Sequence, residues 1–161
     1  MEPKFWHERW SEGRIGFHRA DVNDALIRWW PTLECATTQP VLVPLCGKTV
    51  DLWWLKDQGH SVTGVELSPL AIQQFWDAAN QTPSIESHGP FERTTADGIT
   101  LLCGDFFGLS ESEFAGPCAF YDRASIIALR PDLRSRYCAH LAHILPTGSC
   151  GLMVTLAYDQ S

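Results

Sequence analysis

Short apolar runs alternate with amphipathic helical patterns along this chain. The apolar runs predict strands at residues 41–43, 61–66, 99–103, 118–121 and 151–157. Apolar residues spaced three and four apart predict helices at residues 3–11, 21–30, 49–58, 69–80 and 131–145. Because strands and helices alternate, parallel pairing through right-handed crossovers is favoured. The pattern therefore predicts an α/β fold, an open and mostly parallel Rossmann-like sheet with helices on both faces.

Polar and turn-forming residues mark the boundaries of these elements. Asp21 is the expected N-terminal cap of the second helix, and Pro31 ends that helix. Ser68 followed by Pro69 is typical of a helix start. Residues 81–98 are polar and rich in Pro, Gly, Ser and Thr, so they predict a long loop with room for one extra strand turn.

The composition is that of one globular domain. The 161 residues are 45% apolar and only 19% charged, which excludes a disordered chain. We interpret residues 1–161 as a single domain, with residues 1–30 as a helical cover and residues 41–161 as the α/β core. The net charge of −7 disfavours nucleic acid. Without a secretory signal or an apolar run of ~18 residues, we expect a cytoplasmic monomer with no membrane or nucleic-acid partner.

The cysteines and histidines do not form a recognisable metal or disulfide pattern. Six cysteines are scattered without a C-x-x-C pair, which predicts reduced thiols. His140 and His143 lie at helical spacing, but no fourth ligand is evident. We therefore expect no bound metal.

The strand ends hold the candidate binding chemistry, because ligands of such sheets bind at the carboxyl ends of the strands. Gly47 lies in the turn after the first strand, where its backbone could approach a ligand closely. The second strand ends in Glu66, an acceptor suited to the two hydroxyls of a ribose. Because the turn has no G-x-G-x-x-G pattern, a nucleoside fits better than a dinucleotide. The alternative is that Glu66 only caps the helix that begins at Ser68.

Two further strands end in polar residues next to aromatic ones. Asp105 is placed to bond an adenine amino group, and Phe106 to cover the ring, although an isolated Phe at such a position also suits the core. Arg123 could capture a carboxylate with two hydrogen bonds, or it could form a local ion pair with Asp122.

A phosphate-handling enzyme is the main alternative from the residues themselves. Gly47-Lys48-Thr49 resembles the end of a P-loop, and Asp122 follows an apolar strand as a magnesium ligand would. The P-loop also needs a glycine five positions before Gly47, and Leu42 stands there. The alternative function is thus a magnesium-dependent nucleotide hydrolase that uses Gly47, Lys48 and Thr49.

Several motifs, in order and spacing, closely resemble the bacterial branch of the thiopurine S-methyltransferase family. The motifs are Trp6-x-x-x-Trp10, Gly16-Phe17-His18, Val43 to Lys48, Gly59 to Ser68, and Tyr121 to Ser125, and the resemblance runs from Trp6 to Asp159. It implies a class I methyltransferase that uses S-adenosyl-L-methionine as cofactor. The implied reaction transfers a methyl group to the sulfur of thiopurines or other aromatic thiols, or to selenium or tellurium compounds.

The resemblance also assigns residue roles. It implies cofactor contacts from Trp10, Leu45, Glu66, Asp105, Phe106 and Arg123, and acceptor contacts from Phe17 and Arg123. An aromatic ring such as Trp10 can stabilise the sulfonium cation. Because aromatic thiols ionise readily, no strong general base is required, and the sequence does not identify a catalytic residue.

Members of this family continue past the last predicted strand with a final strand pair, which this chain lacks. The resemblance therefore implies a truncated chain, whose acceptor site and turnover are open. A cofactor-binding fragment without turnover is the second alternative. Cys46 could be a nucleophile, but the sequence places no histidine partner beside it, and a small buried residue is the other interpretation.

Overall fold

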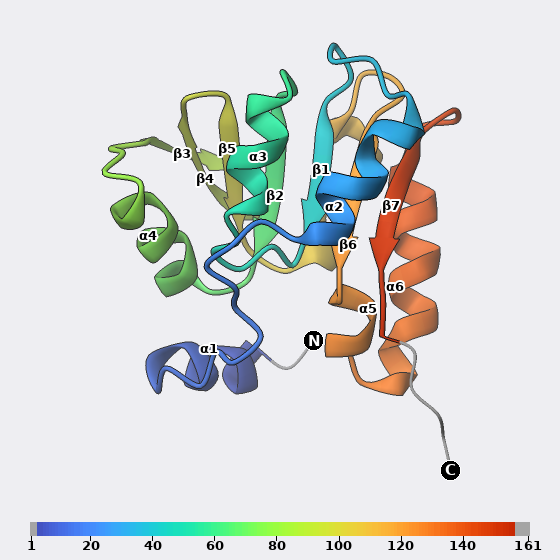
Figure 1. Ribbon diagram of the computed structural model, residues 1–161. Helices are drawn as coiled ribbons and strands as arrows, with labels where there is room; N and C mark the ends of the chain where they lie inside the picture. Colours follow the sequence, from blue (N-terminus) through green and yellow to red (C-terminus); the bar gives the residue numbers. More distant parts are fainter. Residues whose placement is uncertain (1–2, 157–161) are drawn as a thin grey trace.

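The computed structural model describes residues 3–156, and within them seven strands form one sheet (Figure 1). The strands are β1 (Val41–Pro44), β2 (Val62–Glu66), β3 (Ser84–His88), β4 (Phe91–Ala96), β5 (Ile99–Cys103), β6 (Ala119–Arg123) and β7 (Cys150–Val154). The α-helices are α1 (Pro3–Ser11), α2 (Asp24–Trp29), α3 (Asp51–Asp57), α4 (Pro69–Ala78), α5 (Ser125–Ala128) and α6 (Pro131–Ile144). Short 3-10 helices are η1 (Trp30–Leu33), η2 (Phe106–Gly108) and η3 (Glu111–Glu113).

The strand order is β3-β4-β5-β2-β1-β6-β7. Five adjacent strands pair in parallel, in the order β5, β2, β1, β6 and β7. The remaining two are antiparallel, since β4 pairs in this way with both β3 and β5. Val41 of the central strand β1 aligns with Val62 on one side and with Ala119 on the other. The predicted α/β fold with a mostly parallel sheet is confirmed. The strand order changes direction at β1, and this is where an open α/β sheet binds its ligands.

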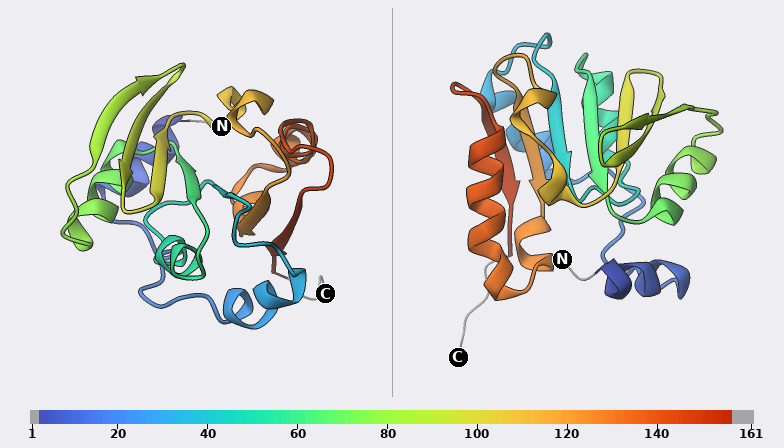
Figure 2. Two further views of the ribbon diagram at one scale, coloured as in Figure 1. Left: turned by 90° about the horizontal axis from the view of Figure 1, so that it is seen from above. Right: turned by 180° about the vertical axis from the view of Figure 1, so that it is seen from behind.

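Helices cover both faces of the sheet, as predicted. Seen from above in Figure 2, α2 and α3 lie on one side and α6 lies on the other. Along β1, the fully buried Val41 belongs to the core on the α2 and α3 side, and Leu42 belongs to the core on the α6 side. This alternation follows from the two-residue period of a strand. A strand that is buried on both faces is apolar throughout, which explains the run Val41-Leu42-Val43.

The helix starts agree with the sequence at α4 and differ at α2. Ser68 caps α4, since its hydroxyl accepts a hydrogen bond from the amide of Ala71, and Pro69 is the first helical residue. The expected cap Asp21 of the second helix is wrong. Asn23 caps α2 instead, through a side-chain oxygen that accepts from the amide of Ala25 at 2.9 Å. Asp21 and Asn23 both precede this helix within four positions, and either can act as a cap, so local chemistry alone did not select between them.

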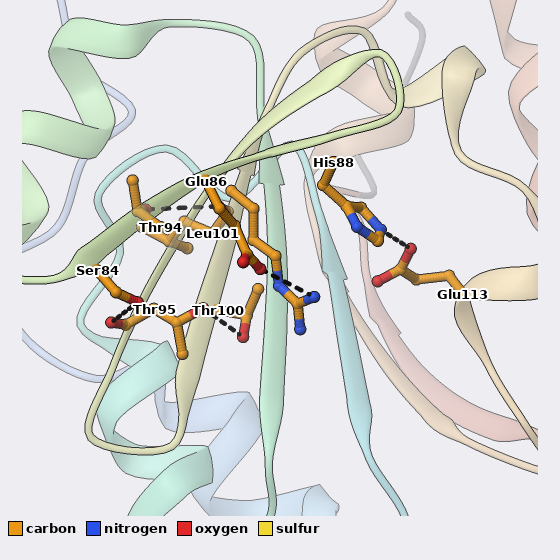
Figure 3. Close-up of polar contacts among 9 residues, drawn as sticks. Ser84, Glu86, His88, Thr94, Thr95, Thr100, Leu101 and Glu113 are labelled. Atoms are coloured by element: carbon orange, nitrogen blue, oxygen red, sulfur yellow. Dashed lines mark hydrogen bonds and ion pairs between the residues drawn. The ribbon is translucent and has the colours of Figure 1, made fainter.

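The predicted loop at residues 81–98 is wrong, because it forms the hairpin of β3 and β4. Figure 3 shows how polar contacts hold this hairpin. The Ser84 hydroxyl donates to the carbonyl of Thr95 at 3.2 Å within the hairpin, and the Thr95 hydroxyl lies 3.2 Å from that of Thr100 on the neighbouring strand β5. Glu86 pairs with Arg93 across the hairpin at 3.4 Å. These two strands are held mainly by hydrogen bonds and bury few apolar side chains. The hydrophobic pattern of the sequence therefore did not predict them.

The last expected strand, residues 151–157, corresponds to β7, whereas residue 157 lies outside the described residues. All six cysteines are free. The sulfurs of Cys35 and Cys150 lie 3.1 Å apart. Within residues 3–156, no helix is long and apolar enough to cross a membrane.

Two fully buried carboxylates join β6 to α3 and α6 through tyrosine hydroxyls. Tyr121 of β6 donates to Asp51 at 2.9 Å, and Tyr137 of α6 donates to Asp122 at 2.7 Å. Burial raises the pKa of both tyrosines well above its usual range, and the neighbouring carboxylate adds to this shift. A buried carboxylate that loses such a donor is left partly unsatisfied.

We therefore expect the change Tyr137→Phe to lower the free energy of unfolding by about 1.5–3 kcal/mol, the range for hydrogen bonds to charged groups. Urea unfolding measures it. The double change Tyr137→Phe with Asp122→Asn is expected to cost less than the sum of the two single changes, because the two groups interact directly. Additive losses would contradict the coupling.

Candidate functional site

One cavity of about 580 Å³ lies at the carboxyl ends of β1, β2 and β6, a volume typical of small-molecule sites. These strand ends lie at the lower edge of the sheet in Figure 1, where α1 and α5 also lie. Five of the seven predicted site residues line the cavity. They are Trp10, Phe17, Leu45, Glu66 and Arg123.

The turn after β1 forms the floor of the cavity and has an unusual backbone. Leu45 has φ +48° and Gly47 has φ +57°, so two residues within three positions are left-handed. A Cβ added at Gly47 would lie 3.3 Å from the Trp10 ring. Glycine is therefore favoured at position 47 by both its backbone conformation and its close approach to Trp10. The amide of Cys46 donates to the Val65 carbonyl at 3.0 Å, which holds the turn against β2.

Glu66 joins the two turns that border the cavity. One carboxylate oxygen accepts from the amide of Gly47 at 2.8 Å, and the other accepts from the amide of Ser68 at 2.7 Å. Burial raises the pKa of Glu66, although these amides oppose the shift. Glu66 therefore caps the start of α4 and also lines the cavity, so the helix-cap interpretation and the ligand-contact interpretation are compatible. Each carboxylate oxygen keeps a second lone pair for a ligand hydroxyl.

Aromatic residues form the wall opposite the sheet. Trp10 of α1 is buried, and Phe17 packs edge-on against it with ring centroids 5.8 Å apart. Phe17 also packs against Trp6. The Lys48 ammonium lies 5.9 Å from the Trp10 ring centroid, so this ring already has a cation near its face.

Arg123 ends β6 and reaches across the cavity to the amino-terminal segment. Its guanidinium donates to the carbonyl of Phe17 at 3.1 Å. The Asp122 carboxylate bonds the amide of Ser125 and the hydroxyl of Tyr137, so it is engaged away from Arg123. The hydroxyl of Ser125 donates to the Pro44 carbonyl at 3.0 Å, which ties the end of β6 to the end of β1. Among the described residues Arg123 forms no ion pair with Asp122, and its capture of a carboxylate stays a prediction.

Asp105 and Phe106 lie at the same edge of the sheet but outside the residues that line the cavity. Cys103 aligns with Glu66, so Asp105 follows the neighbouring strand end. Asp105 is exposed and caps η2 by accepting from the amide of Phe107. Phe106 is 1% exposed and packs against the Tyr137 ring at 5.2 Å. The position of Phe106 is that of a core residue.

Sequence reasoning missed several cavity residues, which the fold brings in from distant segments. They include Arg9, His18, Arg19, Asn23 and Leu156. The charged groups that line the cavity are Arg9, Arg19, Lys48, Arg123 and Glu66, so cations outnumber the carboxylate there although the whole chain carries a net charge of −7. Such a lining attracts anions. The motif that contains Phe17 also held His18, and this was the one local signal available.

The phosphate-handling alternative finds little support in this geometry. Lys48 donates to the Gln74 side chain at 2.8 Å, and both oxygens of the fully buried Asp122 accept hydrogen bonds from protein groups. Cys46 is buried, which raises the pKa of its thiol well above the usual value and disfavours a nucleophilic thiolate. Among the described residues, no group of three or more His, Cys, Asp or Glu side chains could hold a metal ion.

Two solved structures with the same fold are methyltransferases. One is a methyltransferase from Anabaena variabilis described as SAM-dependent, with a TM-score of 0.60 and 15% identity over 92% of this chain and 58% of that chain. Another is the 1,6-didemethyltoxoflavin-N1-methyltransferase of Burkholderia thailandensis, with a TM-score of 0.61 and 16% identity over 98% of this chain and 62% of that chain. At such identity the likeness establishes the class I methyltransferase fold.

The sequence comparisons identify the family. The family described as thiopurine S-methyltransferase matches residues 1–161. The thiopurine S-methyltransferase of Pseudomonas fluorescens Pf0-1 is 50% identical over all of this chain, which spans 74% of that relative. The enzyme of the same name from Pseudomonas paraeruginosa PA7 is 51% identical over 99% of this chain and 73% of its own length. With the cavity at the strand ends and the match over its whole length, the chain belongs to the thiopurine S-methyltransferase family.

Proposed function

We propose that this chain binds S-adenosyl-L-methionine in the cavity at the ends of β1, β2 and β6 and transfers its methyl group to the sulfur of a thiopurine or another aromatic thiol. The observation that carries this proposal is the 2.8 Å bond between the Gly47 amide and the Glu66 carboxylate inside the cavity. It places a close-approach turn and a ribose acceptor side by side. Family membership supports the reaction, and the glycopeptide N-methyltransferase MtfA, of the same fold, has been solved in complex with S-adenosylmethionine.

The cavity and the neighbouring strand end together supply one group for each part of this cofactor. Glu66 accepts hydrogen bonds from the ribose hydroxyls, and Leu45 packs on the nucleoside. Trp10 lies next to the positive sulfur. Asp105, one strand further along the sheet edge and next to the cavity lining, accepts from the adenine amino group, and Phe106 supports this turn from the core. These assignments follow the order of the strand ends, β1, β2 and β5.

The acceptor side is formed by Phe17 and Arg123. Phe17 is 41% exposed, so it offers an open ring face to an aromatic acceptor. Arg123, at the opposite wall, can pair with a thiolate or with the carboxylate of the cofactor. Attack of a thiolate on a sulfonium methyl group joins opposite charges, so a site of apolar walls that excludes water favours the transition state.

The cationic lining supports an anionic sulfur acceptor. Selenium or tellurium compounds are proposed as further acceptors because they are soft nucleophiles like thiolates. A monomeric state, a cytoplasmic location and the absence of a nucleic-acid partner complete the proposal, and the net charge of −7 supports the last of these.

Calorimetry with S-adenosylhomocysteine, combined with a methyl-transfer assay on thiophenol in the presence of a chelator, tests the proposal. We expect binding and transfer without magnesium. An activity that needs magnesium and is lost in Lys48→Ala would favour the nucleotide hydrolase. Binding without transfer to any thiol would identify a cofactor-binding fragment.

The role of Trp10 can be separated from its packing by comparing two ligands. In Trp10→Leu we expect affinity for S-adenosylmethionine to fall by a further factor of about 2–30 relative to S-adenosylhomocysteine, because only the former carries the sulfonium charge and cation–π attraction contributes ~0.5–2 kcal/mol. The ratio of the two dissociation constants is the readout. Trp29→Leu, at an exposed position on α2, is the control. If the ratio of the two dissociation constants were unchanged in Trp10→Leu, the proposed contact between Trp10 and the sulfonium would be wrong.

A further inference from the structure

The segment between α1 and α2 is fixed across the mouth of the cavity. The guanidinium of Arg123 bonds the Phe17 carbonyl, and the Phe17 ring packs against Trp6 and Trp10 of α1. The backbone amide of His18 donates to the Ile15 carbonyl at 2.8 Å. These contacts hold the residue that follows Phe17 in place on the cavity wall.

His18 lines this cavity and is half-buried. Within residues 3–156, no protein atom forms a hydrogen bond with its imidazole ring, in contrast to His60, whose ring bonds the Trp30 side chain and the Gln39 carbonyl. The ring of His18 therefore keeps a nitrogen lone pair available to a ligand in the cavity.

The surroundings of His18 keep this ring neutral. Burial lowers its pKa below the ordinary 6.5, and the positive charges of Lys48 and Arg123 lower it further. Other charged groups that line the cavity are Arg9, Arg19 and Glu66, again mostly cations. At pH 7 the imidazole is thus in its free-base form, and a proton that it accepts is easily released.

The other titratable groups of the described cavity lining are poor bases. Both oxygens of Glu66 accept backbone hydrogen bonds. The thiol of Cys46 is buried, the hydroxyl of Tyr121 donates to Asp51, and the remaining charged side chains are cationic lysine and arginines. Glu66 faces the proposed ribose, whereas His18 has a ring without a hydrogen bond to the described part of the protein and adjoins Phe17 on the proposed acceptor side.

We propose that His18 is the general base that removes the S–H proton from acceptor thiols that are not ionised in solution. This inference rests on the proposed methyl transfer. The imidazole nitrogen takes the proton, and the acceptor sulfur forms its new bond to the methyl carbon. The electron pair of the breaking carbon–sulfur bond stays on the donor sulfur, which becomes a neutral thioether. The imidazolium then releases its proton to water.

A pair of acceptors with different acidity tests this role. A nitro-substituted thiophenol is already a thiolate at pH 7, whereas a benzylic thiol is protonated. We expect His18→Gln to lower kcat/KM for the benzylic thiol by about 10²-fold or more, the lower end of the effect of general bases, and to leave the nitrothiophenol nearly unaffected. His7→Gln, on the exposed side of α1, is the matched control and should leave both rates unchanged.

The pH dependence gives a second readout. For the benzylic thiol, kcat/KM of the unsubstituted chain should rise with pH to a plateau that begins near the His18 pKa, below 6.5. In His18→Gln the rise should continue toward the pKa of the thiol itself. NMR titration of the His18 ring protons, without methyl donor, should give the same low midpoint and a change in those signals when the benzylic thiol is added.

The outcomes separate this inference from the function on which it rests. An equal loss with both thiols, or no loss with either, overturns the role of His18 while the methyltransferase proposal stands. Retained S-adenosylhomocysteine binding in His18→Gln shows that the variant is folded. Absence of transfer from the unsubstituted chain to either thiol overturns both proposals together.

Discussion

Replacing Glu66 with alanine is expected to remove measurable binding of S-adenosylhomocysteine. The change deletes the acceptor of the Gly47 and Ser68 amides and the proposed acceptor of the ribose hydroxyls. Hydrogen bonds to a charged group contribute about 1.5–3 kcal/mol each, so two lost ribose contacts weaken binding by at least about 10²-fold. Calorimetry measures the change. Glu86→Gln, on the exposed face of β3, is the control for a lost surface carboxylate.

The conservative change Glu66→Gln separates charge from shape. Glutamine keeps one oxygen acceptor, so we expect a smaller loss of affinity than with alanine. In the unsubstituted chain, affinity should fall on acidification, and the fall should begin above pH 4.5, because burial raises the Glu66 pKa above this ordinary value and the protonated carboxyl is a weaker acceptor. Glutamine does not ionise, so its profile should lack this step. The same acid step in both proteins would contradict the assignment.

Replacing Phe106 with alanine is expected to affect folding more than cofactor affinity. The ring is 1% exposed and packs against Tyr137 and His140, and loss of a buried Phe side chain costs about 3–5 kcal/mol. Urea unfolding measures this loss, and calorimetry below the unfolding transition measures the affinity that remains.

Phe107→Ala is the matched control for this change, since it removes the same side chain from the same turn at a half-buried position. It should destabilise the protein less. If Phe106→Ala lost its cofactor affinity while its free energy of unfolding stayed near that of the unsubstituted chain, the ring would be a ligand contact and our structural interpretation of Phe106 would be wrong.

The parallel part of the sheet was predictable because burial on both faces requires apolar strands. Val41-Leu42-Val43 and Ile99 to Cys103 appear in the sequence as short apolar runs for that reason. Glu66 was predictable for a related reason, since a carboxylate directly after such a strand reaches the ligand edge of the sheet. The resemblance to the family then placed Trp10 and Phe17 next to this edge, where the structure has them.

The remaining features depend on contacts between distant segments. β3 consists mostly of exposed residues, so it shows neither the strand spacing nor the helix spacing of apolar residues. Its pairing with β4 decides its structure. Asp105 and Phe106 follow the same strand, but Asp105 is exposed and Phe106 is buried. The sequence pattern alone does not distinguish these two environments. His18 gains its proposed role from Lys48 and Arg123, which are 30 and 105 positions away in the chain.

The hydrogen bond from Ser125 to the Pro44 carbonyl makes the wall formed by the strand ends more rigid than the opposite wall. It locks the ends of β1 and β6 to each other, and buried strands hold them from behind. The opposite wall, α1 and the segment that follows it, is joined to β6 by the exposed bond between Arg123 and Phe17. Segments with few buried bonds open at the lowest free-energy cost. Ligands are therefore expected to enter and leave by displacement of the amino-terminal wall, while the strand ends stay in place.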